Sequence, residues 1–274
     1  MEAYAAGGNR IRRLDLDTGE ILCEALIDGC SAVCACAETV YAAGKKEGVI
    51  YRLDKRLLPC GVCAGGPGLS ALAVSRDEKR LFALLSDADG VLMLSGHDGA
   101  PMIFARTGVT PVGMRLDAQG ELLLVAGGRD GCAQLLCAKT LNTLCSFKGE
   151  GICCDALCCG NRICALLLTP SLQTLLMVWE RSGSYRQICF PGAPGSLVFR
   201  DQLLFVSAGE WLYAFDTRRL RLVDRRFLEN GPGKLIDAGK LLLLCRMKEM
   251  LYRVDDRRET CLCDQVHDVS VIQD

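Results

Sequence analysis

Cysteine offers the widest range of chemistry in this sequence, because 18 of the 274 residues are cysteine. Cys60 and Cys63 have the spacing of half a zinc site. A complete site needs a second pair at a suitable separation, and neither Cys153 with Cys154 nor the C-terminal pair of Cys261 and Cys263 supplies one. We therefore predict no metal site and no cofactor, and thiols that are buried as small hydrophobic side chains.

Two cysteine pairs show which way such thiols should face. Cys34 and Cys36 are two residues apart within an apolar run, and so are Cys261 and Cys263. Side chains two residues apart on a strand point to the same face of the sheet. We expect both members of each pair to lie in the hydrophobic core.

Histidine, the usual general base and metal ligand, is scarce, and His97 and His267 are the only two copies. A multi-histidine copper site cannot be built from them, and a Ser-His-Asp hydrolase would depend on one of the two. His97 lies in the turn-like segment Ser95–Gly99, where we predict a turn residue. His267 precedes Asp268 near the C-terminus and stays a candidate for ligand binding.

The elements that must position any site follow from an internal repeat of about 40 residues, a period typical of solenoids and propellers. A short apolar segment that ends in an acidic or small residue recurs seven times: Ile11–Asp15, Ile50–Asp54, Val91–Ser95, Ala133–Cys137, Leu176–Glu180, Leu212–Asp216 and Leu251–Asp255. An apolar strand precedes each copy, and connections rich in Gly and Asp join the two as hairpins. Further strands on either side complete four antiparallel strands per repeat.

The ends of the chain predict how the repeats close. The chain begins on what would be the second strand of a repeat, and Val266–Asp274 forms one extra strand after the last repeat. That extra strand would complete the first sheet and remove the open edges of an unclosed array. We predict a single all-β domain over residues 1–274, a seven-bladed β-propeller closed by its C-terminal strand.

Two segments carry a resemblance to a known family. Gly68–Ala83 (GLSALAVSRDEKRLFA) and Gly108–Val125 (GVTPVGMRLDAQGELLLV) resemble YVTN-type propeller repeats, including those of lactonase-like propellers. The usual Pro-Asp-Gly turn of that family is reduced in this chain to Arg76-Asp77 and Ala118-Gln-Gly120. The resemblance implies the propeller fold, and its relatives include sugar-lactone hydrolases, cofactor-dependent redox enzymes and interaction scaffolds, so fold alone does not choose a function.

Charged loop residues indicate where a propeller of this kind would bind. The loops that enter each sheet, and those between its second and third strands, should gather around one mouth of the central channel. Our candidates for ligand binding there are Lys45, Asp87, Asp89, Arg106, Arg129, Asp130, Glu210, Arg246 and His267; Lys46, Glu47, Lys248, Glu249 and Asp268 come from the same loops.

Charge and composition argue against several classes of partner. The 32 basic and 33 acidic residues leave a formal net charge of −1, which disfavours nucleic acid and anionic membranes as partners. A run of arginines between Arg218 and Arg226 is interspersed with acidic residues, which we expect to neutralise much of its field. The sequence has no apolar stretch of membrane-spanning length and does not begin with a signal-peptide pattern, so we expect a cytoplasmic location.

These observations favour a non-catalytic scaffold that binds a partner protein or a small polar ligand at the channel mouth. The alternative is a lactonase-like hydrolase, in which acidic and arginine side chains would polarise a lactone carbonyl and activate water. Asp87, Asp89, Arg106 and Arg129 would be the residues of that second function, provided that they converge on one pocket.

Overall fold

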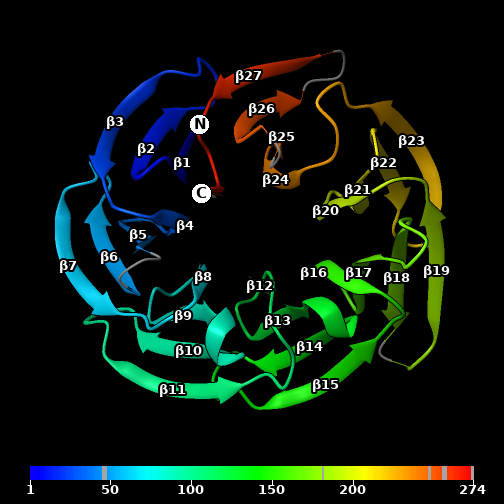
Figure 1. Ribbon diagram of the computed structural model, residues 1–274, viewed down its shortest axis with the longest axis horizontal. Helices are drawn as coiled ribbons and strands as arrows, with labels where there is room; N and C mark the ends of the chain where they lie inside the picture. The colour runs from blue at the N-terminus through cyan, green and yellow to red at the C-terminus, as the bar shows by residue number, and fades with distance from the viewer. Residues whose placement is uncertain (45–47, 181, 246–247, 255–257, 273–274) are drawn as a thin grey trace.

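The computed structural model describes residues 1–44, 48–180, 182–245, 248–254 and 258–272. These residues form seven four-stranded antiparallel sheets arranged around a central axis (Figure 1). Two 3-10 helices of three residues each, η1 (Ser86–Ala88) and η2 (Gly128–Asp130), lie in loops. In the described part of the chain, no helix has the length and apolar character needed to cross a membrane.

Within each sheet the strands run in order from the innermost, at the axis, to the outermost. Sheet one is β28 (Asp268–Val271), β1 (Glu2–Gly7), β2 (Arg10–Asp15) and β3 (Ile21–Leu26), and sheet two is β4 (Cys30–Ala35), β5 (Thr39–Gly44), β6 (Val49–Asp54) and β7 (Pro59–Ala64). Sheet three is β8 (Leu69–Val74), β9 (Arg80–Leu85), β10 (Gly90–Ser95) and β11 (Pro101–Arg106), and sheet four is β12 (Gly113–Leu116), β13 (Leu122–Gly127), β14 (Cys132–Cys137) and β15 (Thr143–Lys148). Sheet five is β16 (Ile152–Cys159), β17 (Arg162–Leu168), β18 (Thr174–Glu180) and β19 (Tyr185–Phe190), and sheet six is β20 (Pro194–Arg200), β21 (Leu203–Ala208), β22 (Trp211–Asp216) and β23 (Arg221–Phe227). Sheet seven is β24 (Lys234–Ala238), β25 (Lys240–Cys245), β26 (Met250–Val254) and β27 (Glu259–Cys263).

The hydrophobic core lies between neighbouring sheets, which explains why the middle strands are apolar on both faces. Strand β9 shows the pattern clearly. Leu81 and Leu85 pack into the cluster shared with sheet two, while Phe82 and Leu84 pack into the cluster shared with sheet four. Because successive side chains on a strand point to opposite faces, one strand serves two interfaces.

The C-terminal strand closes the ring. Strand β28 pairs antiparallel with β1, so that Ala3 lies opposite Val271 and Ala6 lies opposite Asp268. The backbone N–H of His267 donates to the carbonyl of Ala6 at 2.7 Å. The prediction of an all-β propeller completed by its last strand is therefore confirmed.

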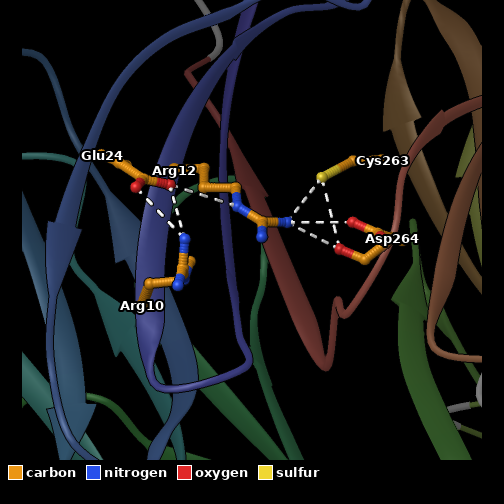
Figure 2. Close-up of polar contacts among 5 residues, drawn as sticks. All are labelled: Arg10, Arg12, Glu24, Cys263 and Asp264. Carbon is orange, nitrogen blue, oxygen red and sulfur yellow. Dashed lines mark hydrogen bonds and ion pairs between the residues drawn. The ribbon is translucent and has the colours of Figure 1, made fainter.

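A buried arginine fastens the junction between sheets seven and one. Figure 2 shows Arg12 on β2 reaching across to Cys263, the last residue of β27, and to Asp264, which follows it. Its Nη1 donates to the carbonyl oxygen of Asp264 at 2.7 Å and lies 3.1 Å from the sulfur of Cys263. On the other side, its Nε lies 3.6 Å from Glu24, which also pairs with the more exposed Arg10. Only 7% of Arg12 is exposed, so these groups lie in the packed junction.

The acidic residue that ends several of the repeats has a local structural role. The Oδ1 atom of Asp54 accepts the backbone N–H groups of Arg56 and Leu58, both at 2.8 Å, and so holds the turn between β6 and β7. Asp216 holds the equivalent turn of sheet six in the same way. Such carboxylates replace hydrogen bonds that the turning backbone cannot make to itself. Leu57 takes a left-handed φ of 63° in this turn, and its side chain is buried, which offsets the strain.

The two cysteine pairs whose members are two residues apart differ in their burial. Cys34 and Cys36 pack against the same cluster between sheets two and three, as predicted. Cys263 is buried but Cys261 is exposed, so the prediction for this pair is wrong. The register between β26 and β27 shifts by one residue there, and such a bulge breaks the alternation of faces on which the prediction depended.

Candidate binding site in the central channel

A polar cavity of about 290 Å³ opens at the beginning of the innermost strands. All seven sheets contribute to its lining, with Ser31 and Ser70 from two of them and the charged pairs described below from others. A second cavity of about 400 Å³ continues toward the ends of the same strands. Arg115 and Lys234 line both cavities, so these two cations lie where the cavities adjoin.

The first ion pair of the channel joins three sheets. Arg115 on β12 donates from Nη2 to Asp155 Oδ2 on β16 at 2.7 Å, and from Nη1 to the carbonyl of Leu197 on β20 at 2.8 Å. Asp155 Oδ2 also accepts the backbone N–H of Leu197 at 2.8 Å. The exposed fractions of the two charged side chains are 28% for Arg115 and 13% for Asp155, so the pair is largely shielded from water. Charge-assisted bonds of this kind are stronger than neutral ones.

The second ion pair repeats this arrangement across the closing strand. Lys234 on β24 donates to Asp268 on β28, and Asp268 Oδ2 accepts the backbone N–H of Val33 on β4 at 3.0 Å. Two residues further along β28, the hydroxyl of Ser270 accepts the N–H of Ala35 at 3.0 Å. The carboxylates and hydroxyls of the innermost strands thus satisfy backbone N–H groups of the next sheet, which the sheets' own ladders leave unpaired.

One polar atom of this lining is left over. The hydroxyl oxygen of Ser31 is buried and has no hydrogen-bond partner among the described residues. Ser31 belongs to β4 and lines the 290 Å³ cavity. Because a buried hydroxyl without a partner is costly, this atom is a natural place for a bound polar group to be recognised.

Among the predicted channel-mouth residues that the structure describes, His267 lines this cavity, and so does Asp268 beside it. The Nδ1 atom of His267 lies 3.8 Å from Glu249 Oε1, and 42% of the His267 side chain is exposed. Six others are exposed loop or strand-end residues away from the cavity lining: Asp87, Asp89, Arg106, Arg129, Asp130 and Glu210. Lys45 and Arg246 lie outside the described residues.

The reason for this difference is the distance of each loop from the axis. Asp87 lies in η1, and Asp130 lies in η2, and both helices connect the second and third strands of a sheet. These loops join the second and third strands of their sheets, so they lie farther from the axis than the innermost strand does (Figure 1). The four residues proposed for lactone hydrolysis therefore do not line this cavity.

Sequence reasoning missed Arg115, Asp155 and Lys234. A usable signal exists, because each is a charged residue inside a short apolar segment that pairs as an innermost strand. On such a strand, a charged side chain can reach water only through the channel. Its partner, however, comes from another sheet about 40 residues away along the chain, a spacing that only the repeat specifies.

Among known proteins, no family model matches this chain, and no curated protein matches its sequence. The resemblance to YVTN-type repeats therefore stays a prediction. Solved structures do match. The crystal structure of a functionally unknown protein from Desulfotomaculum acetoxidans DSM 771 has a TM-score of 0.80 and 13% identity, over 98% of this chain and 98% of that one.

Two further structures match over most of their length. Hydrazine synthase of Kuenenia stuttgartiensis has a TM-score of 0.70 and 13% identity, over 83% of this chain and 76% of that chain. BBS1N, solved in complex with ARL6DN, has a TM-score of 0.69 and 14% identity, over 86% of this chain and 80% of that chain. At such low identity these similarities establish the fold alone, and the chain is a β-propeller.

Proposed function

We propose that this protein is a non-catalytic propeller scaffold that binds a partner protein or a small polar ligand at the mouth of its central channel. The observation that carries the proposal is the polar 290 Å³ cavity at the beginning of the innermost strands, to which every sheet contributes. A volume of this size suits a small molecule or a single inserted side chain. Ser31 supplies a hydroxyl that lacks a partner among the described residues, and His267 adds an imidazole to the same lining.

The charges of the channel favour binding over catalysis. Asp155 and Asp268 are each held by a cation and by a backbone N–H of a neighbouring sheet. A general base must give up such contacts or share them with a proton during each cycle. In this channel the same contacts connect the sheets, so a fixed polar surface for recognition fits these residues better.

The rim of the cavity also supports a protein partner. Val112 lines the cavity and is 49% exposed, and Ile152, the first residue of β16, is 43% exposed. Leu172, in the loop between β17 and β18 on the same face, is 71% exposed. Exposed apolar residues around a polar centre are a frequent feature of interaction sites. One of the structural neighbours, BBS1N, was solved with a protein partner.

A thermal-shift panel of the reduced protein tests the proposal, with sugar phosphates, sugar lactones, divalent metal ions and a short oligonucleotide as probes. A probe present at about 100 times its Kd should add about 2.7 kcal/mol, or about 5–10 °C in Tm. Ser31→Ala is the diagnostic variant, because Ser31 makes no described side-chain hydrogen bond that its loss would break. Ser146→Ala on β15, an exposed site away from the channel, is the matched control.

The expected result is a shift that Ser31→Ala abolishes and Ser146→Ala retains. Without ligand, Ser146→Ala should match the wild-type Tm, and the Tm of Ser31→Ala should be no lower, because the substitution removes a buried hydroxyl that has no described partner. A shift that survives Ser31→Ala would place the binding site elsewhere. Turnover of a lactone would show that the protein is a hydrolase and would contradict the non-catalytic scaffold function. If no small molecule shifts the Tm, affinity capture with wild-type and Val112→Asp proteins should recover a partner with the wild type alone.

A further inference from the structure

The outermost strand of every sheet is an edge, and one of these edges differs from the others. Six of the seven pairings between third and outermost strands contain a register shift: those of β3, β7, β11, β15, β23 and β27. The pairing of β18 with β19 is regular from Trp179 opposite Tyr185 to Thr174 opposite Phe190. Bulges twist an edge and interrupt its row of hydrogen-bonding groups, so they protect it from pairing with another chain. Strand β19 lacks this protection.

Other protective features are also missing from β19. Pro59 begins β7 and Pro101 begins β11, and proline removes a backbone donor from an edge. Strand β23 carries four charged residues. Strand β19 has the sequence YRQICF, with Arg186 as its one charge, and Tyr185 is 60% exposed. Its β-branched and aromatic residues favour an extended strand.

The surroundings of β19 indicate the charge of a partner. Arg186 is exposed, and its Nη1 donates to the carbonyl of Arg219 at 3.4 Å, which places it beside the turn between β22 and β23. Arg218 and Arg219 in that turn are exposed as well. Among the described residues, none of these three arginines forms an ion pair with an acidic side chain. Asp216, the nearest acid in sequence, uses its Oδ1 to accept the backbone N–H groups of the turn.

The residues of β19 differ between its two faces. Ile188 and Phe190 pack into the core between sheets five and six, and Arg186 alternates with them on the same face. Tyr185, Gln187 and the exposed Cys189 lie on the opposite face. A strand added beside β19 would therefore meet arginines on one face and an exposed aromatic ring on the other.

We infer that β19 binds an extended acidic segment of a partner protein as a fifth strand of sheet five. Backbone hydrogen bonds to the regular edge would supply part of the affinity, as in other cases of strand addition. Acidic side chains at alternate positions would face Arg186 and the two turn arginines, and apolar side chains would face Tyr185. This lateral site is separate from the proposed channel site.

The test uses three synthetic peptides of about eight residues, the length that spans one edge strand. The first alternates glutamate with valine, the second alternates lysine with valine, and the third repeats the first with all of its amides N-methylated, so that neither edge can donate backbone hydrogen bonds. Fluorescence anisotropy measures binding to the full chain. We expect the first peptide to bind saturably, and the other two at least about tenfold more weakly.

Variants of exposed residues locate the site without disturbing the core. Arg186→Glu should weaken binding of the first peptide about tenfold or more through charge repulsion. Gln187→Glu, on the face that meets the peptide's valines, should also weaken binding, because it places a charge against apolar side chains. Ser146→Glu, which adds a negative charge on the bulged edge β15, is the matched control and should leave binding unchanged. Bound peptide should also slow alkylation of Cys189 but not of Cys60, which is exposed on β7.

Several outcomes would overturn the inference. The first is the absence of saturable binding of the first peptide. The second is an equal affinity for its N-methylated form. The third is a loss of affinity in Ser146→Glu as large as that in Arg186→Glu. Competition by an oligothymidylate would assign the arginines to nucleic acid instead. Far-UV circular dichroism and the Tm of each variant verify folding, and the Cys189 protection measured on the wild-type chain requires no substitution.

Discussion

Replacing Arg12 should weaken the junction that closes the propeller. Arg12 is 7% exposed, and its Nη1 donates to the carbonyl of Asp264 at 2.7 Å, from sheet one to the segment that follows sheet seven. Arg12→Met keeps an unbranched apolar stem and removes the guanidinium. The carbonyl of Asp264 and the sulfur of Cys263 then lose their shared donor (Figure 2).

The magnitude follows from these contacts. A hydrogen bond to a charged group contributes about 1.5–3 kcal/mol, and the lost one lies in a packed junction. The ion pair with Glu24 adds little, because the Glu24 side chain is 44% exposed and exposed pairs contribute about 0–1 kcal/mol. We therefore expect Arg12→Met to lower the free energy of unfolding by about 2–3 kcal/mol. That corresponds to a fall in Tm of about 5–10 °C.

The assay is urea and thermal unfolding followed by far-UV circular dichroism, in reducing buffer because the described cysteines are free thiols. Arg10→Met is the matched control: the Arg10 side chain is 35% exposed, pairs only with Glu24 in the described structure, and should cost less than about 1 kcal/mol. Arg12→Lys retains the charge but not the forked donor, so its free energy of unfolding should lie between those of Arg12→Met and Arg10→Met. It replaces Arg12→Met in the comparison if that variant does not fold. Equal stability of Arg12→Met and Arg10→Met would refute the role assigned to this junction.

Three further predictions concern the closing strand, a thiol and a turn. Removing residues 265–274 deletes β28, exposes the hydrogen-bonding edge of β1 and takes Val266 and Val269 out of the core, so it should lower the free energy of unfolding by at least about 3 kcal/mol. An unchanged Tm would contradict the closure. Hydrogen bonds from Thr140 and the backbone of its turn lower the pKa of the Cys137 thiol, whereas burial raises the pKa of the Cys132 thiol. Mass-spectrometric mapping should therefore find Cys137 alkylated before Cys132 as the pH rises, and the reverse order would contradict this. Backbone N–H groups lower the pKa of Asp216 below its ordinary value of 3.8, so its contribution to stability is complete above that pH and is lost as the pH falls through the lower pKa of the folded state. Asp216→Asn should therefore make the loss of stability with acid shallower below about pH 4. Identical acid titrations of the two proteins would argue against the role of this carboxylate in its turn.

Much of the architecture could be predicted from the sequence because it depends on neighbours along the chain. Hairpins follow from apolar alternation and from Gly and Asp at turns, and those signals recur at a regular spacing. The extra strand near Val266 predicted the closure, since a missing first strand and a surplus last strand complement each other. The bulge beside Cys261 was not visible, because a register shift depends on how two strands pair rather than on either strand's composition.

The candidate site was predicted less well, and its residues show why. His267 was found because it sits at the beginning of the closing strand, which the repeat itself locates. Asp87 and Arg129 were selected from the correct face of the propeller, but the distance of a loop from the axis is a property of the assembled ring. Chemistry-bearing residue types alone do not distinguish the inner from the outer part of that face.

Sequence therefore specified the repeat, the strands and the way in which the ring closes, because alternation and turn chemistry act over a few residues. The tertiary structure decided which charges meet. Arg115, Asp155, Lys234 and Asp268 belong to four different sheets, and their ion pairs exist only because closure brings the innermost strands around one axis. Arg12 is one of three arginines on β2, a composition typical of a surface strand, yet it is buried because the end of sheet seven packs over it. Contacts between residues distant in sequence depend on the packing of whole sheets, and no local pattern encodes them.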